Sequence, residues 1–148
     1  MTVTDPATTL VREIDIKAPA ERVFDALTDP DELVKWWGSD DLYRCEKMER
    51  DLRVGGRWRT TGKGSDGDAF VVEGVYRAIE RPHLIEYSWL PSWGTPHDAE
   101  TLVRFELTER DGTTHLRVTH SGFSSTESRD EHDMGWTRVL GWLRDYVQ

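Results

Sequence analysis

The segment SRDEHDMGWTRVLGWLRDY, residues 128–146, decides the fold, because it predicts one long helix that a sheet can wrap around. It contains no proline, and its apolar side chains recur at helical spacing. One stripe carries His132, Trp136, Val139, Leu140, Leu143 and Val147. An apolar stripe of this length needs a partner surface, which the rest of the chain must supply.

The partner surface is predicted to be an antiparallel sheet. Residues 10–17 alternate apolar and polar side chains, as a half-buried strand does. Six further segments, rich in β-branched or aromatic residues and bounded by Gly, Pro or Asp, read as strands: 42–49, 55–62, 69–79, 83–90, 100–109 and 114–123. The tight-turn dipeptide Asp111-Gly112 joins two of them. We therefore expect a meander of about seven strands.

Two short helices are predicted after the first strand. Pro19 stands where a first helical turn would begin, and apolar residues follow at helical spacing. The stretch TDPDELVKWWGSDD, residues 28–41, has the features of a complete second helix. Thr28 or Asp29 can cap its start, Pro30 fits the first position, and Gly38 can close its end.

The second short helix presents Leu33, Trp36 and Trp37 on one stripe. The stripe either covers the core of the domain or forms one wall of a ligand cavity. Both alternatives stay open from the sequence.

Composition limits the class of protein. The chain has 148 residues, which predicts one domain over 10–148 after a disordered tail over 1–9. A net charge of −9 disfavours nucleic acid as a partner. Cys45 is the only cysteine, so no disulfide forms within the chain, and a cytoplasmic location is expected. No segment approaches the ~20 apolar residues of a membrane span, so membrane insertion is not expected.

The order of elements predicts an α+β fold. One strand, two short helices, six strands and one long helix bury their apolar faces most simply if the sheet curls around the long helix. Curling leaves a space where the sheet bends away from the helix. Either side chains or a ligand fill that space.

Five segments in order resemble the START-like, or SRPBCC, superfamily, in the branch named after the activator of heat-shock protein 90 ATPase. They are IDIKAPAERVFDALTDPDELVKWWG, DLRVGGRWR, VEGVYRAIERPHLIEYSW, VTHSGF and HDMGWTRVLGWLRDYV. The resemblance covers about residues 10–147. It implies the helix-grip fold, an incomplete antiparallel barrel around the C-terminal helix with a hydrophobic cavity. It implies less about activity, because members include lipid carriers, hormone receptors, polyketide cyclases and chaperone co-factors.

Aromatic side chains supply most of the candidate ligand contacts. Indole N–H and phenol O–H groups in an apolar site need partners, which a bound molecule can provide. The candidate set is Trp36, Trp37, Trp58, Phe70, Tyr76, Tyr87, Trp89, Phe105, His120, Trp136 and Leu140. The loop PSWGTPHD, residues 91–98, either gates the cavity or forms part of a protein contact through Trp93.

The chemistry-bearing residues do not assemble a catalytic motif. His120 is in phase with apolar neighbours, so it is either a structural residue with hydrogen-bonded nitrogens or a polar anchor in the cavity. His132 lies on the helix stripe and can approach His120, but the sequence lacks the further ligands of a metal site. Cys45 reads as a small buried apolar residue. No catalytic residue, metal or cofactor is predicted.

Three functions remain, in this order. The first is a carrier or sensor that binds a small apolar or aromatic molecule in the cavity. The second is a protein-interaction module or chaperone co-factor, which the resemblance implies only for relatives with an additional domain. The third is a cyclase-like or hydrolase-like enzyme that uses His120 with Tyr76, Tyr87 or an acidic group. A homodimer is a further option that no motif supports.

Overall fold

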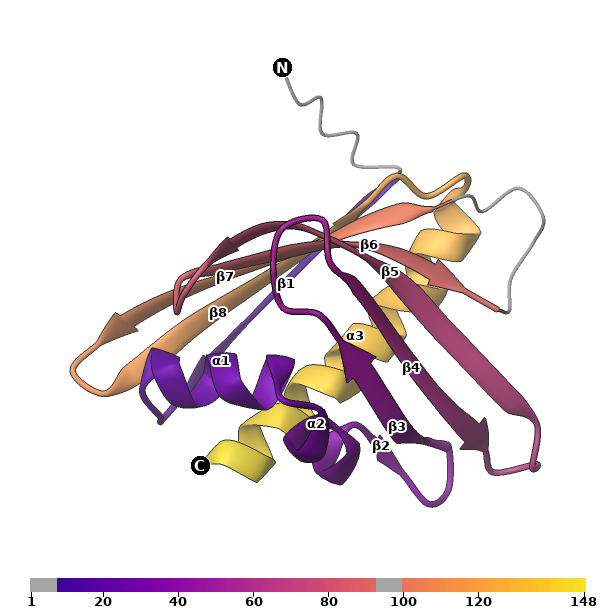
Figure 1. The fold of residues 1–148 in the computed structure, drawn as a ribbon, viewed down its shortest axis with the longest axis horizontal. Helices are drawn as coiled ribbons and strands as arrows, with labels where there is room; N and C mark the ends of the chain where they lie inside the picture. Colours follow the sequence, from indigo (N-terminus) through magenta and orange to yellow (C-terminus); the bar gives the residue numbers. More distant parts are fainter. Residues whose placement is uncertain (1–7, 93–99) are drawn as a thin grey trace.

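One curled sheet wraps around the C-terminal helix (Figure 1). A computed structural model of the chain describes residues 8–92 and 100–148. The strands are β1 (Thr9–Ile16), β2 (Gly38–Ser39), β3 (Tyr43–Arg50), β4 (Arg57–Gly64), β5 (Ala69–Glu80), β6 (Leu84–Pro91), β7 (Thr101–Arg110) and β8 (Thr113–Ser121). The helices are α1 (Ala20–Thr28), α2 (Pro30–Trp36) and α3 (Thr126–Val147).

All strand pairs are antiparallel, in the order β1-β8-β7-β6-β5-β4-β3-β2. The sheet is a meander from β2 to β8, and β1 joins it beside β8. The predicted α+β class, the antiparallel meander and the curl around a long C-terminal helix are confirmed. The two short helices follow β1 as expected.

The strand β2 is the element that the sequence analysis did not include. We expected Gly38 only as the end of a helix, whereas it also pairs with Arg44 and opens a two-residue strand. Gly38 has φ +131, and a Cβ atom there would lie 2.3 Å from the Tyr43 carbonyl oxygen. Only glycine allows β3 to approach so closely. The position therefore lacks the β-branched or aromatic residue by which the sequence would predict a strand.

The predicted cap of α2 is present, while α1 is capped from the sheet. Asp29 accepts a hydrogen bond from the Asp31 N–H through its side chain, and Pro30 occupies the first turn. Pro19 offers α1 no side-chain cap. Instead, Glu109 of β7 accepts a hydrogen bond from the Ala20 N–H at 2.7 Å, which fixes the start of α1 against the sheet.

Two β-bulges sharpen the bend of the sheet around α3. One shifts the β3–β4 register between Cys45 and Lys47, and the other shifts the β5–β6 register between Tyr76 and Ala78. A bulge adds one residue to one strand and increases local bending and twist. The bends lie in the half of the sheet that contains β3 to β6.

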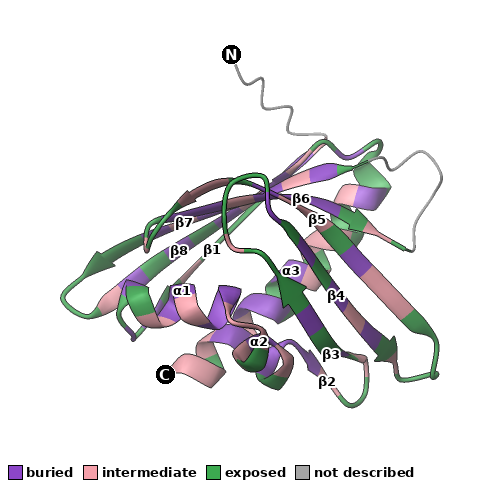
Figure 2. Cartoon of the chain, in the orientation of Figure 1, coloured by how far each residue is buried: buried purple, intermediate pink, exposed green. Residues whose placement is uncertain are grey.

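The inner face of the sheet carries the core (Figure 2). The predicted strand parity is confirmed in β7 and β8. Val103 lies opposite His120 and Phe105 opposite Val118, and all four are at most 1% exposed. Asp111 and Gly112 both have positive φ, as the predicted tight hairpin turn requires.

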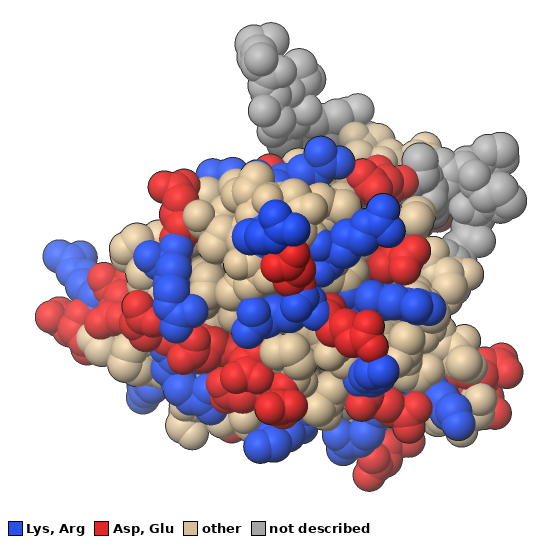
Figure 3. All heavy atoms as spheres, viewed as in Figure 1, with Lys and Arg blue, Asp and Glu red and all other residues tan. Residues whose placement is uncertain are grey.

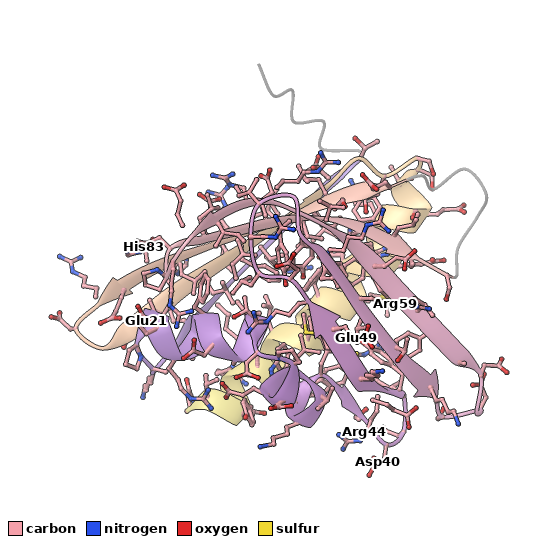
Figure 4. All side chains as sticks on the ribbon, viewed as in Figure 1. Glu21, Asp40, Arg44, Glu49, Arg59 and His83 are labelled. Carbon is pink, nitrogen blue, oxygen red and sulfur yellow. The ribbon has the colours of Figure 1, made fainter. Side chains whose placement is uncertain are left out.

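The face of the molecule seen in Figure 3 is charged, with both signs interspersed. Paired side chains such as Arg44 and Asp40 project from the edge of the sheet near β2 and β3 (Figure 4). Among the described residues, no helix is long and apolar enough to cross a bilayer.

Two predictions fall partly or wholly outside the described residues. The N-terminal tail predicted over 1–9 is described only from Thr8, and β1 starts at Thr9. Trp93 and most of its predicted gating loop lie outside the described ranges.

Gly74 in β5 makes room for the Trp58 indole on the neighbouring strand. Trp58 pairs with Gly74, and its indole donates to the Ser88 carbonyl oxygen of β6 at 3.2 Å. A Cβ atom at Gly74 would lie 1.9 Å from that same oxygen and 2.8 Å from the Trp58 indole nitrogen. The indole thus bridges three strands across a position that must lack a side chain.

Gly74→Ala is expected to lower the free energy of unfolding by roughly 1–3 kcal/mol, because the new methyl group collides with backbone. Urea unfolding followed by tryptophan fluorescence measures the change. Gly141→Ala is the matched control, since a Cβ atom there meets nothing within 4 Å. That variant should gain roughly 0.5–1 kcal/mol from helix propensity. Equal stability of the two variants would contradict the close approach at Gly74.

Candidate functional site

A cavity of about 350 Å³ lies between α3 and the inner face of the bent half of the sheet. Helix α3 packs closely against β1 on the other side, so the open space is on the side of β3 to β6. Six of the eleven predicted ligand contacts line the cavity: Trp37, Trp58, Phe70, Tyr87, Trp89 and Trp136. The volume falls within the range of small-molecule sites.

The other five predicted contacts are buried but are not part of the cavity lining. They are Trp36, Tyr76, Phe105, His120 and Leu140, each at most 4% exposed. Contact of any of the eleven with a ligand stays a prediction. The stripe on α2 does both of the things that the sequence left open. Trp36 fills the core, where its indole donates to the Ala26 carbonyl oxygen at 2.9 Å. Trp37 and Leu33, from the same stripe, face the cavity.

Several lining residues were not among the predicted contacts. Strands β3 to β5 add Tyr43, Cys45, Met48, Thr60 and Val72, the two short helices add Leu27 and Leu33, and α3 adds Glu131, His132, Gly135, Arg138 and Val139. The bulge at Cys45 puts Met48 on the inner face, although strict alternation assigns it to the outer one. Gly135 carries no side chain from which its position could be inferred.

The indole rings form a continuous wall. Trp37 stacks on Trp89 with ring centroids 6.3 Å apart, and its edge contacts Trp136 at 5.8 Å. Trp58 extends the wall through Tyr87 at 4.7 Å and Trp89 at 5.9 Å. Offset and edge contacts at these distances are the stable arrangements of aromatic rings. The wall offers a ligand the faces and edges of four indoles.

The end of the cavity near β2 is formed by Tyr43. Its ring packs edge-on against Phe70 of β5 at 5.6 Å and against Trp142 of α3 at 5.7 Å. The Tyr43 hydroxyl accepts a hydrogen bond from the Trp37 indole at 3.3 Å. Tyr43 therefore connects the sheet, α2 and the C-terminal half of α3.

His120 connects α3 to the sheet through a chain of buried hydrogen bonds. The Trp136 indole donates to His120 Nδ1 at 3.0 Å. His120 Nε2 then carries the proton and donates to the Thr101 hydroxyl at 2.7 Å, and Thr101 donates to the Trp89 carbonyl oxygen at 3.2 Å. Every member of the chain is satisfied only while the imidazole is neutral.

The groups that could ionise inside the cavity are held neutral by burial. Burial raises the pKa of the Tyr43 phenol to about 12 and that of the Cys45 thiol to about 11. The pKa of Tyr87 is raised well above its ordinary value for the same reason. Burial, reinforced by the neighbouring His132, holds the pKa of His120 well below its ordinary value. The Tyr43, Cys45 and Tyr87 side chains in the lining and the adjacent His120 are therefore uncharged near neutral pH.

Helix α3 forms the rim of the cavity. Glu131 and Arg138 are exposed, and both line the opening, so the cavity reaches the surface beside α3. Gly135 lies between them on the same helix face, and a Cβ atom there would meet nothing within 4 Å. The absence of a side chain at this position keeps the rim open.

The side chains of His120 and His132 approach each other, as the sequence allowed. The rings of His120 and His132 have centroids 5.2 Å apart. Within residues 8–92 and 100–148, no group of three or more His, Cys, Asp or Glu side chains is placed to hold a metal ion.

The neutral state of His120 predicts a pH dependence of stability. An imidazole in the unfolded chain titrates near pH 6.5, whereas the folded chain keeps His120 neutral to lower pH. Below pH 6.5 unfolding takes up a proton, so the free energy of unfolding falls by up to about 1.4 kcal/mol per pH unit. His120→Gln should flatten this acid decline, measured by urea unfolding between about pH 5 and 8.

His115→Gln is the control of opposite sign. Hydrogen bonds that His115 donates to the Glu13 and Asp15 carboxylates raise the pKa of this exposed imidazole, so its contribution is present below pH 6.5 and is lost as the pH rises. Its removal should abolish a gain of stability on acidification above about pH 6.5 and leave the decline below that pH nearly unchanged. If His120→Gln leaves the slope unchanged, the folded protein protonates His120, and the assignment of its neutral role is wrong.

The sequence profile described as "Activator of Hsp90 ATPase homolog 1-like protein" matches residues 17–148. No curated protein matches the chain significantly. Among solved structures, protein CV1439 from Chromobacterium violaceum superposes with a TM-score of 0.84 at 22% identity, covering 95% of this chain and 96% of that one.

Two further structures are similar to the chain over nearly their whole length. Protein NE0264 from Nitrosomonas europaea gives a TM-score of 0.81 at 19% identity, covering 97% of this chain and 96% of that one. Protein MLL2253 from Mesorhizobium loti gives a TM-score of 0.75 at 27% identity, covering 94% and 96%. Similarity at these levels of identity establishes a common fold.

Proposed function

The chain belongs to the family of Activator of Hsp90 ATPase homolog 1-like proteins, and on this premise we propose that it binds a small, neutral, apolar or aromatic molecule between the sheet and α3. The protein would act as a carrier or a sensor of that molecule. The cavity of about 350 Å³ is the observation on which the proposal rests. A cytoplasmic location belongs to the proposal as well, and rests on the single cysteine.

The chemistry of the lining supports a neutral apolar ligand. The wall of indole rings favours planar or aromatic surfaces. Burial keeps the Tyr43, Cys45 and Tyr87 side chains uncharged, so no opposite charge is held ready for an ionic ligand deep in the cavity. A charged molecule would lose its hydration without gaining a partner there.

The rim supports access from outside. Gly135 leaves a gap in the surface of α3, beside the exposed Glu131 and Arg138. Because Gly135 has no side chain, a ligand can pass through this gap without displacing one. The charged neighbours remain in solvent, where they can contact a polar end of the ligand.

The two alternative functions have less support. The family description names activation of the Hsp90 ATPase, and a chaperone co-factor therefore stays the second candidate. An enzyme that uses His120 ranks third, because Trp136 and Thr101 occupy both ring nitrogens. Burial also raises the pKa of Tyr76 to about 12, which makes it a poor proton donor or acceptor near neutral pH.

Gly135→Phe tests the proposal by closing the rim. N-phenyl-1-naphthylamine, a neutral apolar dye whose fluorescence rises in dry sites, serves as the probe. We expect the wild-type protein to bind it and Gly135→Phe to bind it at least about tenfold more weakly, because the new ring occupies the opening. Fluorescence titration measures both dissociation constants.

Gly141→Phe is the matched control. Gly141 lies on the same helix and is also free of neighbours within 4 Å, but it is not part of the cavity lining. Its dye affinity should equal that of the wild type. An equal loss of dye affinity in both variants would mean that the substitutions act by disturbing the helix and not by closing the rim, which would contradict the proposal.

Native mass spectrometry of protein purified from its own host identifies the natural ligand. A defined adduct that leaves on denaturation would support the carrier or sensor role. A clean apo mass, together with no thermal shift across a library of apolar compounds, would contradict it and favour the chaperone co-factor.

A further inference from the structure

Two polar atoms in the cavity wall lack a hydrogen-bond partner among residues 8–92 and 100–148. They are the Trp89 indole nitrogen and Nε2 of His132, and both atoms are buried by their neighbours. Both residues line the cavity, and Trp89 is only 7% exposed. Their rings lie nearly perpendicular, with centroids 6.4 Å apart. Buried polar groups are normally paired, so an unpaired neighbouring pair calls for a physical reason.

The two atoms have complementary roles. The Trp89 indole can only donate a hydrogen bond. The Ser128 carbonyl oxygen can only accept, so His132 Nδ1 donates to it at 2.9 Å, and in the tautomer that this bond selects Nε2 is an acceptor. Two residues that line the cavity, with ring centroids 6.4 Å apart, therefore hold one unused donor and one unused acceptor, which a ligand reaches by a small rotation of the rings.

Neighbouring indoles show that this arrangement is particular to Trp89. The indole nitrogens of Trp37, Trp58 and Trp136 donate to Tyr43, Ser88 and His120, respectively. The Trp136–His120 pair is the direct comparison, because there the same two residue types bond to each other at 3.0 Å. At Trp89 and His132 the corresponding groups stay unpaired.

We infer that Trp89 and His132 form a subsite for a neutral hydroxyl or amide group carried by an otherwise apolar ligand. The ligand group donates to His132 Nε2 and accepts from the Trp89 indole, while its apolar part lies against Trp37 and Trp58. A carboxylate has no proton to donate to His132, and an ammonium group has no lone pair for Trp89. This inference rests on the proposed ligand-binding function and specifies the ligand it takes.

Three probes of one shape test the subsite: 2-naphthol, 2-methoxynaphthalene and 2-methylnaphthalene. The hydroxyl donates and accepts, the methoxy group only accepts, and the methyl group does neither. We expect 2-naphthol to bind the wild-type protein about tenfold more tightly than 2-methylnaphthalene, although the methyl compound is the more hydrophobic. The methoxy compound should lie between them. Titration of tryptophan fluorescence gives the three dissociation constants.

Variants locate the selectivity. Trp89→Phe removes the donor and His132→Leu removes the acceptor, and each should reduce the preference for 2-naphthol to about twofold or less. Trp37→Phe is the control, because Trp37 lines the same cavity but its indole nitrogen is already bonded to Tyr43. It should weaken all three probes alike and keep the preference.

An NMR measurement on the wild-type protein tests the subsite without any variant. In a ¹⁵N-labelled sample, 2-naphthol should shift one indole N–H resonance downfield, and 2-methylnaphthalene should not. Equal affinities of the three probes, or no such selective shift, would overturn the inference and leave the binding function intact. Failure of all three probes to bind would overturn both.

Discussion

The hydrogen bond from the Trp136 indole to His120 attaches α3 to β8, and the rest of the site depends on this attachment. On the same side of the helix, Asp133 pairs with Arg12 of β1. Both links hold α3 against the β1–β8 edge of the sheet. The sheet bends at its bulges in the half that contains β3 to β6, and there α3 meets it through ring contacts such as Trp142 with Tyr43, which leave a space between helix and sheet. The cavity is that space.

The attachment also sets the polarity of the interior. His120 can accept from Trp136 and donate to Thr101 only as a neutral imidazole, and its burial keeps it in that state. The Thr101 hydroxyl carries the chain of bonds on to the Trp89 backbone, so the strand that positions the Trp89 ring is held by the same network. A neutral interior and a correctly placed aromatic wall are therefore two results of one hydrogen-bonded chain.

Periodicity predicted the elements well and the cavity only in part. Helical and strand spacing placed α2, α3 and β7–β8 because each buries one regular face. The inward position of Met48 depends on a bulge, which strand alternation does not reveal. Trp36 and Trp37 share one stripe, yet only the packing of α2 against α1 decides that one fills the core and the other faces the cavity. Gly135 contributes by lacking a side chain, so no pattern marks it.

The unfilled volume has a thermodynamic consequence for the whole molecule. Side chains around a void lose van der Waals contacts, so the empty protein is less stable than a filled one would be. Any molecule that occupies the 350 Å³ raises the free energy of unfolding by mass action, in proportion to the logarithm of its concentration above the dissociation constant. Because cells remove unfolded chains, the proposed binding function would make the abundance of the protein follow the supply of its ligand.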